Sequence, residues 1–235
     1  RMIIFDQVSK IYPSGETVLD NVSFHINQGE FVILTGPSGA GKTTIGKLLI
    51  KEIIPTSGSI SVESLELTKL SPKDISKLRR KVGVIFQDYK VIPDKTVSEN
   101  ISLALEIINF PKKEIKDRVS HLLELVGIPS KGNLFPSQLS GGELQRAAIA
   151  RAIVSEPTIL FADEPTGNLD EKTSQDIFNL LKQVNKIGTT VIMSTHNPSF
   201  LGEMRHIHLE KGKMILDSST SSTSTQKSTK KKKNV

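Results

Sequence analysis

A glycine-rich segment from Gly36 to Thr43 has the residue types and the spacing of a phosphate-binding loop. It matches G-x-x-x-x-G-K-[ST], follows an apolar run of strand length and opens a helical pattern. Its glycines allow backbone N–H groups to converge on phosphate oxygens, and the start of the following helix adds a positive dipole. We therefore expect Lys42 to contact the β- and γ-phosphates of a nucleotide and the Thr43 hydroxyl to bind Mg²⁺. The alternative is a glycine-rich turn that only caps a buried helix. The predicted nucleotide-binding residues of this segment are Gly36, Pro37, Ser38, Gly39, Ala40, Gly41, Lys42, Thr43 and Thr44.

Two adjacent carboxylates, Asp163 and Glu164, follow the apolar run at residues 158–162. Ligands of open α/β sheets bind at the carboxyl ends of the strands, so we expect this pair beside the phosphate loop. Asp163 is predicted to bind Mg²⁺, and Glu164, which points the other way, is predicted to polarise an attacking water. Without a phosphate loop upstream, the same residues would more often form a solvated turn.

The segment Leu139-Ser-Gly-Gly-Glu143 can start a helix and can also bind phosphate. Ser140 followed three residues later by Glu143 is a capping box. The bare N–H groups of Gly141 and Gly142 and the Ser140 hydroxyl can in addition face a γ-phosphate. Because this helix start lies far along the chain from the phosphate loop, we expect its phosphate to belong to a second subunit. The sequence therefore predicts an ATP-dependent homodimer.

The hydrophobic pattern around these motifs predicts an α/β fold. Continuous apolar runs of strand length, typical of a parallel sheet buried on both faces, occupy residues 82–86, 158–162 and 190–194. Further β-type runs occupy residues 2–5, 22–26, 30–35 and 59–62, and a hairpin is expected over 206–216. Helical spacing predicts a helix from Lys42 to before Pro55 and amphipathic helices near 115–126 and 173–187. A helical insert of about 88–155 thus interrupts a core of 2–87 and 156–217.

The composition narrows the class of protein. With 235 residues, 37% of them hydrophobic, the chain can form one substantial domain or a core with an attached subdomain. No apolar stretch reaches the roughly 18 to 20 residues that a membrane-spanning helix needs. The absence of cysteine excludes disulfides, thiolate nucleophiles and zinc–thiolate sites.

The net charge of +6 is concentrated near the C-terminus. Five lysines and no acidic residue follow Asp217, so residues 1–217 carry a net charge of only +1. A nucleic-acid-binding domain should carry its basic surface on the folded part, so we expect no nucleic acid partner. The Ser/Thr/Lys-rich residues 218–235 have too little apolar surface to offset the entropy of ordering, and they are predicted to be disordered.

Taken together, the motifs resemble those of ATP-binding-cassette ATPases over nearly all of residues 2–217. The resemblance implies a P-loop NTPase (RecA-like) core with an antiparallel β subdomain and an inserted α-helical subdomain. It also implies that the protein converts ATP and water to ADP and phosphate, with ATP and Mg²⁺ as cofactors.

The same resemblance implies roles for single residues that would be weak signals alone. Tyr12 corresponds to the aromatic residue that stacks on adenine, and His196 to the histidine that holds the γ-phosphate. Gln87 corresponds to the glutamine that contacts Mg²⁺ and couples to a membrane partner. Asp170, in Asn168-Leu169-Asp170, belongs to the loop that communicates across the dimer and is expected to bind nucleotide. The resemblance thus makes Glu164, His196 and Gln87 the catalytic residues, and Thr43, Gln87 and Asp163 the metal ligands.

Three stretches resemble a subgroup within the family. Residues 163–170 resemble ATPases that serve mechanotransmission and lipoprotein-release permeases, and residues 86–97 and 185–197 are closer to the cell-division members. The resemblance implies an integral membrane permease-like partner of the FtsX type and control of cell-wall hydrolases. It places the protein in the cytoplasm, peripheral on the inner face of the plasma membrane, with membrane contact mainly through the permease. Glu143 stands where many relatives have Gln.

Other functions fit less well. The ATPase subunit of a lipoprotein-release or drug-export ABC transporter is the alternative of the same class. Relatives that act on chromosomes need a long coiled coil between the two phosphate-binding motifs, and no sustained heptads occur there. Ribosome-acting relatives carry two cassettes, whereas this chain has a single Lys-Thr phosphate loop. A P-loop kinase has no use for Leu-Ser-Gly-Gly-Glu.

Overall fold

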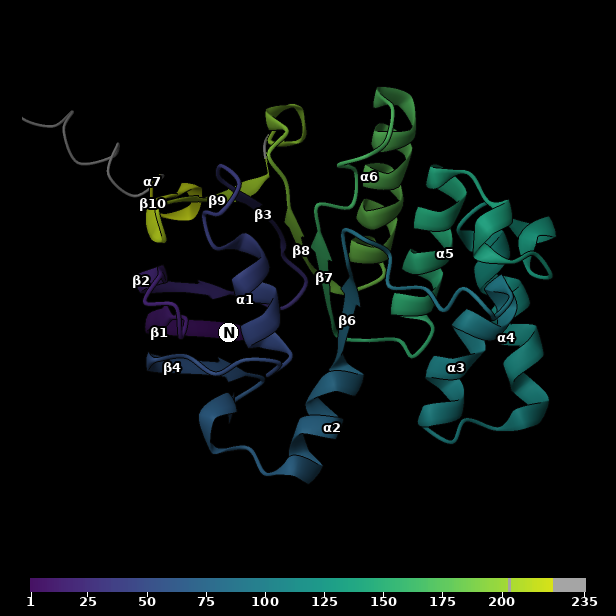
Figure 1. Cartoon of the computed structure of the whole chain (residues 1–235), viewed down its shortest axis with the longest axis horizontal. Helices are drawn as coiled ribbons and strands as arrows, with labels where there is room; N and C mark the ends of the chain where they lie inside the picture. The colour runs from purple at the N-terminus through teal and green to yellow at the C-terminus, as the bar shows by residue number, and fades with distance from the viewer. Residues whose placement is uncertain (203, 222–235) are drawn as a thin grey trace, which may run out of the picture.

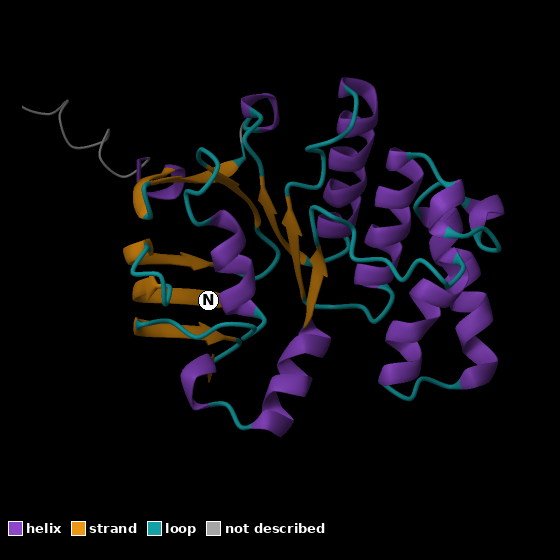
Figure 2. Cartoon of the chain, viewed as in Figure 1, coloured by secondary structure: helices purple, strands orange, loops and turns teal. Residues whose placement is uncertain are grey.

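The computed structural model describes residues 1–202 and 204–221, which form two β-sheets with helices between and beside them (Figures 1 and 2). Within these residues the larger sheet has six strands in the order β10-β9-β3-β8-β7-β6. Its strands are parallel from β6 to β9, and β10 is antiparallel to β9. Their bounds are β3 (Phe31–Thr35), β6 (Val82–Ile85), β7 (Ile159–Asp163), β8 (Thr190–Ser194), β9 (Arg205–Glu210) and β10 (Lys213–Asp217).

The smaller sheet is antiparallel and has the order β2-β1-β4-β5 in the described part of the chain. Its strands are β1 (Ile3–Ile11), β2 (Thr17–Ile26), β4 (Ser57–Val62) and β5 (Leu65–Glu66). A parallel α/β core, an antiparallel β part and a helical insert are therefore all present, and the predicted fold class is confirmed.

The apolar strands of the large sheet are covered on both faces. Every residue of β3, β7 and β8 is buried, as their continuous apolar runs predict. Helix α1 (Lys42–Leu49) lies between the two sheets and buries Ile45, Leu48 and Leu49 (Figure 1). Helix α6 (Glu171–Lys186) covers the opposite face with Ile177 and Leu181. The phosphate loop thus joins two elements, β3 and α1, that are both held by buried side chains.

Three helices form the insert between β6 and β7. They are α3 (Val97–Ile107), α4 (Lys112–Leu125) and α5 (Gly141–Ile153), and α3 packs against both of the others. Helix α2 (Pro72–Lys81) connects the small sheet to β6, and 3-10 turns occur at η1 (Leu67–Lys69), η2 (Pro129–Lys131), η3 (Pro136–Gln138) and η4 (Pro198–Phe200). Among the described residues, no helix combines the length and the apolar character needed to cross a membrane.

The strands β1 and β2 are longer than the sequence pattern predicts. Gln7 (φ 51°) and Asn21 (φ 52°) have left-handed backbone conformations, and the β1–β2 register shifts within both strands. These irregularities are β-bulges, which interrupt the alternation of buried and exposed residues. The predicted strands over 2–5 and 22–26 are therefore only the regular parts.

Two helices differ from the sequence prediction. Helix α1 ends at Leu49 rather than continuing toward Pro55, and Lys51 already has a left-handed φ of 50°. Helix α2 is absent from the prediction because Leu78 is its one buried residue, so it has no apolar stripe. Its N-cap, Ser71, accepts a hydrogen bond from the N–H of Asp74.

The predicted tail boundary at Ser218 is too early. Ser218–Ser221 form a helical turn, α7, next to β9. The Ser218 hydroxyl oxygen accepts the N–H of His206 (3.0 Å), and the N–H of Ser219 donates to Asp217 (3.0 Å). Residues 222–235 of the predicted tail lie outside the described residues.

The contact between α1 and β7 leads to a first prediction. A Cβ atom on Gly46 would lie 2.3 Å from a ring carbon of the buried Phe161. Overpacking of this kind costs about 1–3 kcal/mol, and a contact as close as this one lies toward the upper end, whereas alanine in place of glycine gains only about 0.5–1 kcal/mol in a helix interior. We expect Gly46→Ala to lower the free energy of unfolding by about 1–2 kcal/mol in urea titration. Lys47→Ala, on the exposed side of the same helix, should change it by less than about 0.5 kcal/mol. Equal stability of Gly46→Ala and the parent would contradict the close packing.

Candidate nucleotide-binding site

The loop between β3 and α1 curls around the ammonium group of Lys42. The Lys42 side chain is 6% exposed, and its Nζ donates to the carbonyl oxygens of Gly36 (2.7 Å) and Pro37 (3.1 Å). Gly36 has a φ of 144°, and a Cβ there would lie 2.2 Å from the Leu209 carbonyl oxygen. Only glycine fits this position. The tip of the loop, residues 37–39, is exposed.

Asp163 and Glu164 point in different directions at the end of β7. The buried Asp163 accepts a hydrogen bond from the Ser194 hydroxyl (2.7 Å). Glu164 has a left-handed φ of 48°. Its Oε1 lies 3.4 Å from Lys42 Nζ, and its Oε2 lies 2.6 Å from His196 Nδ1. The structure therefore joins the phosphate loop, the second carboxylate and the histidine in one polar network.

Ser194 is a site residue that the sequence prediction misses. It ends β8, pairs in register with Asp163 and is fully buried. Its hydroxyl donates to Asp163 and accepts the N–H of Glu164 (2.9 Å), so one side chain orients both carboxylate residues. The signal was a serine at the carboxyl end of an otherwise buried strand, where ligand-binding groups of parallel sheets gather.

A cavity of about 560 Å³ lies over this network. It is lined by the exposed side of the phosphate loop and by Tyr12, Gln87, Glu164 and His196. The Tyr12 hydroxyl lies 3.5 Å from Thr44 Oγ1, which places the aromatic ring at the edge of the same cavity. The structure thus brings together the predicted residues that follow β1, β6, β7 and β8 and most of the loop, whereas Gly36, Pro37 and the buried Asp163 do not line this cavity.

The predicted magnesium ligands have the right chemistry for that ion. The Thr43 hydroxyl, the Gln87 amide and the Asp163 carboxylate offer oxygen atoms, which Mg²⁺ prefers. In the described part of the chain, no group of three or more His, Cys, Asp or Glu residues is placed to hold a metal ion. A cation at these residues therefore needs phosphate oxygens and waters to complete its shell, as Mg²⁺ sites that include substrate phosphates do.

The residues of the Leu-Ser-Gly-Gly-Glu segment lie around a separate cavity of about 410 Å³. Ser140, Gly141, Gly142 and Glu143 line it together with Asp170, and no residue of the phosphate loop does. The structure therefore keeps the two predicted phosphate-binding elements of one chain apart. Asp170 is the N-cap of α6 and accepts the N–H of Thr173 (2.9 Å). This hydrogen bonding to Thr173 lowers the pKa of Asp170.

The capping box at the start of α5 is fully formed. Glu143 Oε2 accepts both the N–H and the hydroxyl of Ser140, each at 2.9 Å, and the Ser140 oxygen accepts the N–H of Glu143 (3.4 Å). Lys131 Nζ lies 3.0 Å from Glu143 Oε1. The backbone hydrogen bond from Ser140, followed by the bond from Lys131, lowers the pKa of Glu143 to about 2. Glu143 is therefore ionised at neutral pH.

The hydrogen bonds of Ser194 predict that its loss lowers ATP hydrolysis more than its effect on stability explains. Ser194→Ala removes the hydroxyl that holds Asp163 and Glu164, so we expect ATP hydrolysis to fall by at least about tenfold and unfolding free energy by about 1–3 kcal/mol. Thr190→Val at the other end of β8 removes a similar bond, to the N–H of Gly29 (2.9 Å). This control should lose comparable stability but keep its turnover per folded molecule. Equal turnover in both variants would show that Ser194 does not position the carboxylates.

Comparison with known proteins identifies the family. The sequence profile of the ABC transporter family matches residues 19–167. The cell division ATP-binding protein FtsE of Streptococcus pneumoniae is 50% identical over 214 residues, which cover 90% of this chain and 93% of that protein. FtsE of Bacillus subtilis is 46% identical over 220 residues, covering 93% of this chain and 96% of that protein.

Solved structures show the same fold. The dimeric ATP-binding cassette MJ0796, bound to ADP and Pi in a post-hydrolysis state, has a TM-score of 0.85 and 35% identity. The match covers 92% of this chain and 97% of that one. CbiO1 from Clostridium perfringens, part of the ABC transporter complex CbiONQ, has a TM-score of 0.83 and 28% identity over 92% of this chain and 87% of its own. The chain belongs to the ATP-hydrolysing subunits of the ABC transporter family.

Proposed function

We propose that this ATPase dimerises on ATP and drives a separate permease-like membrane protein of the FtsX type in cell division. The observation that carries the proposal is that the phosphate-loop cavity and the Ser140–Glu143 cavity are separate on one chain. Each is half of a site, so a second copy must supply the other half. The relatives named FtsE, at 45–50% identity, support the division role.

The first half-site binds the nucleotide. Tyr12 stacks on the adenine, the phosphate loop surrounds the β-phosphate, and Lys42 contacts the β- and γ-phosphates. In the structure Lys42 is held by two loop carbonyls and Glu164. A phosphate that enters replaces these partners with stronger ones, so nucleotide binding frees the Glu164 carboxylate.

The chemistry then requires a positioned water at the γ-phosphate. Glu164 polarises this water, and His196 and Gln87 contact the γ-phosphate and its surroundings. Mg²⁺, held by Thr43, Asp163 and Gln87, supplies positive charge to the phosphate oxygens when bound. Ser194 bonds the Asp163 carboxylate and the Glu164 backbone N–H, while the Glu164 carboxylate contacts Lys42 and His196, so the two carboxylates have different partners and each serves one role.

The second half-site completes the first across a two-fold axis. The N-terminus of α5, with Ser140, Gly141 and Gly142, faces the γ-phosphate bound by the other subunit. Two-fold symmetry then gives two equivalent shared sites. The solved MJ0796 cassette, described as dimeric, supports this arrangement.

Replacement of the water-activating carboxylate tests the shared site. Glu164→Gln should slow hydrolysis and leave ATP binding intact, so ATP-bound dimers accumulate in the presence of Mg²⁺. We expect light scattering to give twice the monomer mass at saturating ATP and the monomer mass with ADP. The control Glu156→Gln removes an exposed carboxylate far from both cavities and should behave as the parent. A Glu164→Gln variant that stays monomeric at saturating ATP would overturn the mechanism.

The loop after Gln87 is the proposed contact with the permease. Arg151 donates from its guanidinium to the carbonyl oxygens of Tyr89 and Lys90, both at 2.7 Å, so the loop is tied to α5. At its other end Asn100 bonds both backbone groups of Ile92. The side chains of Tyr89, Val91 and Ile92 remain half-exposed. This apolar strip beside Gln87 suits a short cytoplasmic helix of a permease, which would hold the protein at the inner face of the plasma membrane.

Polar substitutions in this strip test the docking site. Tyr89→Ser combined with Val91→Ser should reduce co-purification with an FtsX-type permease at least about tenfold, as expected when central apolar anchors of an interface are lost. Basal ATP hydrolysis and thermal stability should be retained. Ile187→Ser, at an apolar residue that is 78% exposed on another surface, is the matched control. If stability collapses and binding per folded molecule survives, the strip belongs to the core and the permease binds elsewhere.

A further inference from the structure

Lys131, in a turn outside every predicted motif, contacts the second half-site. Turn η2 (Pro129–Lys131) lies between α4 and α5, and the residues that directly follow it are bonded to the start of α3. The N–H of Ser98 donates to the Gly132 carbonyl oxygen, and the N–H of Val97 donates to the Leu134 carbonyl oxygen, both at 2.9 Å. The position of Lys131 is therefore set by the fold of the insert.

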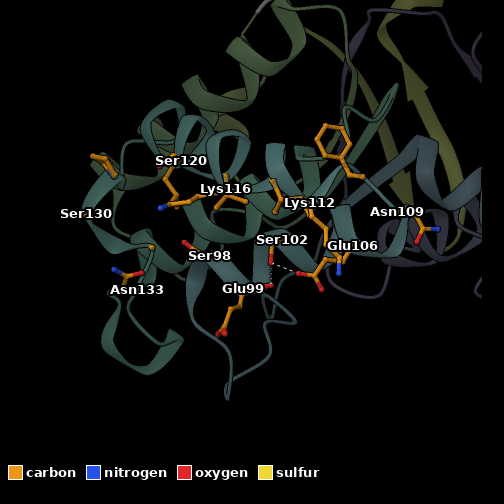
Figure 3. A pocket seen from close by; sticks show the side chains of 16 residues that line it. Ser98, Glu99, Ser102, Glu106, Asn109, Lys112, Lys116, Ser120, Ser130 and Asn133 are labelled. Carbon is orange, nitrogen blue, oxygen red and sulfur yellow. Dashed lines mark hydrogen bonds between the residues drawn. The ribbon is translucent and has the colours of Figure 1, made fainter.

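The same turn also forms part of another cavity, which Glu143 does not line. This cavity has about 1080 Å³ and lies between α3 and α4. Ser130 and Asn133 lie at one end of it, and Asn109 lies at the other (Figure 3). Lys131 is absent from this lining and instead reaches Glu143. Within one turn, Ser130 thus lines the cavity between α3 and α4, whereas Lys131 contacts Glu143 at the start of α5.

The two carboxylate oxygens of Glu143 have different partners. Oε2 binds the N–H and the hydroxyl of Ser140, and Oε1 lies 3.0 Å from Lys131 Nζ. Glu143 and Lys131 are each about a third exposed, so the pair by itself adds little to stability. Its location matters more, because Glu143 places a negative charge in the cavity at the start of α5, where the proposed function places a γ-phosphate.

We infer that Lys131 is a positioning residue of the shared ATP site, which compensates the charge of Glu143 and so allows the start of α5 to accept a γ-phosphate. The inference rests on the proposed function. Without Lys131, the carboxylate repels the phosphate and holds the Ser140 hydroxyl more strongly. With Lys131, part of its charge is neutralised, so an incoming phosphate can compete for the Ser140 hydroxyl, which donates to Glu143 in this structure. The requirement for Lys131 therefore depends on the presence of a carboxylate at position 143.

A double-mutant cycle in the Glu164→Gln protein tests this dependence. The measurement is the ATP concentration that gives half-maximal dimer, by light scattering with Mg²⁺ present. We expect Lys131→Ala to raise this concentration about tenfold, the effect of one charge-assisted contact, and Lys131→Arg to stay within about twofold of the parent. When Glu143→Gln is also present, Lys131→Ala should have an effect below about twofold, because no carboxylate remains to be compensated.

Controls separate this effect from a general loss of charge or of folding. Lys113→Ala removes the same charge from an exposed position of α4 and should leave dimerisation unchanged. Binding of a fluorescent ATP analogue to the monomer and the thermal unfolding midpoint should be the same for Lys131→Ala and the parent. If Lys131 only supported the fold, Lys131→Ala would lower the thermal unfolding midpoint or weaken binding of the ATP analogue to the monomer.

Two outcomes overturn the inference, and they are distinct from failure of the proposed function. The inference is wrong if Lys131→Ala leaves dimerisation unchanged, or if it weakens dimerisation equally with Glu143 and with Gln at that position. If the Glu164→Gln parent itself does not dimerise, the shared-site mechanism fails and the inference falls with it.

Discussion

The buried ammonium group of Lys42 is the constraint on which the rest of the site depends. A charge that is only 6% exposed needs partners, and the structure provides two loop carbonyls and the Glu164 carboxylate. These partners come from the β3–α1 loop and from the end of β7, with β8 between the two strands. Ser194 of β8 in turn holds both carboxylate residues. Three parallel strands and one loop therefore form a single electrostatic unit, and the proposed function has phosphate groups replace the present partners of Lys42.

The start of α5 also pairs a charged side chain with an opposite charge, but there the central group is a carboxylate and its partner is a lysine. There the fold presents a carboxylate, Glu143, and sets a lysine from a neighbouring turn beside it. Both helix starts combine backbone N–H groups with a lysine, but they open into separate cavities. The helical insert carries the second helix start, the loop tied by Arg151 and the cavity between α3 and α4. One set of packed helices thus connects the surface proposed to face phosphate to the surface proposed for the permease.

The sequence predicts elements well where a single local pattern defines them. The structure contains the predicted strands over 82–86, 158–162 and 190–194 and the amphipathic helices α4 and α6. Each of these segments has a continuous or periodic pattern of apolar residues, which defines its secondary structure. The prediction fails at β1 and β2, where bulges at Gln7 and Asn21 break the alternation, and at α2, which buries only Leu78. It also fails at Ser218, because the bond that orders this residue comes from His206, which lies on another strand. Long-range contacts decide these positions.

The sequence by itself determined the glycine-rich loop motif, the adjacent carboxylates and the capping box of α5, since each depends on residues close together in the chain. The order of these motifs along the chain indicated the family. Only the tertiary structure decided which distant side chains meet. It placed His196 against Glu164, made Ser194 the common partner of the Asp163 carboxylate and the Glu164 backbone N–H, and brought Lys131 to Glu143. It also separated the two predicted phosphate-binding elements of one chain. The physical reason is that local spacing sets a residue's backbone geometry, whereas the partners of its charge depend on strand order and helix packing.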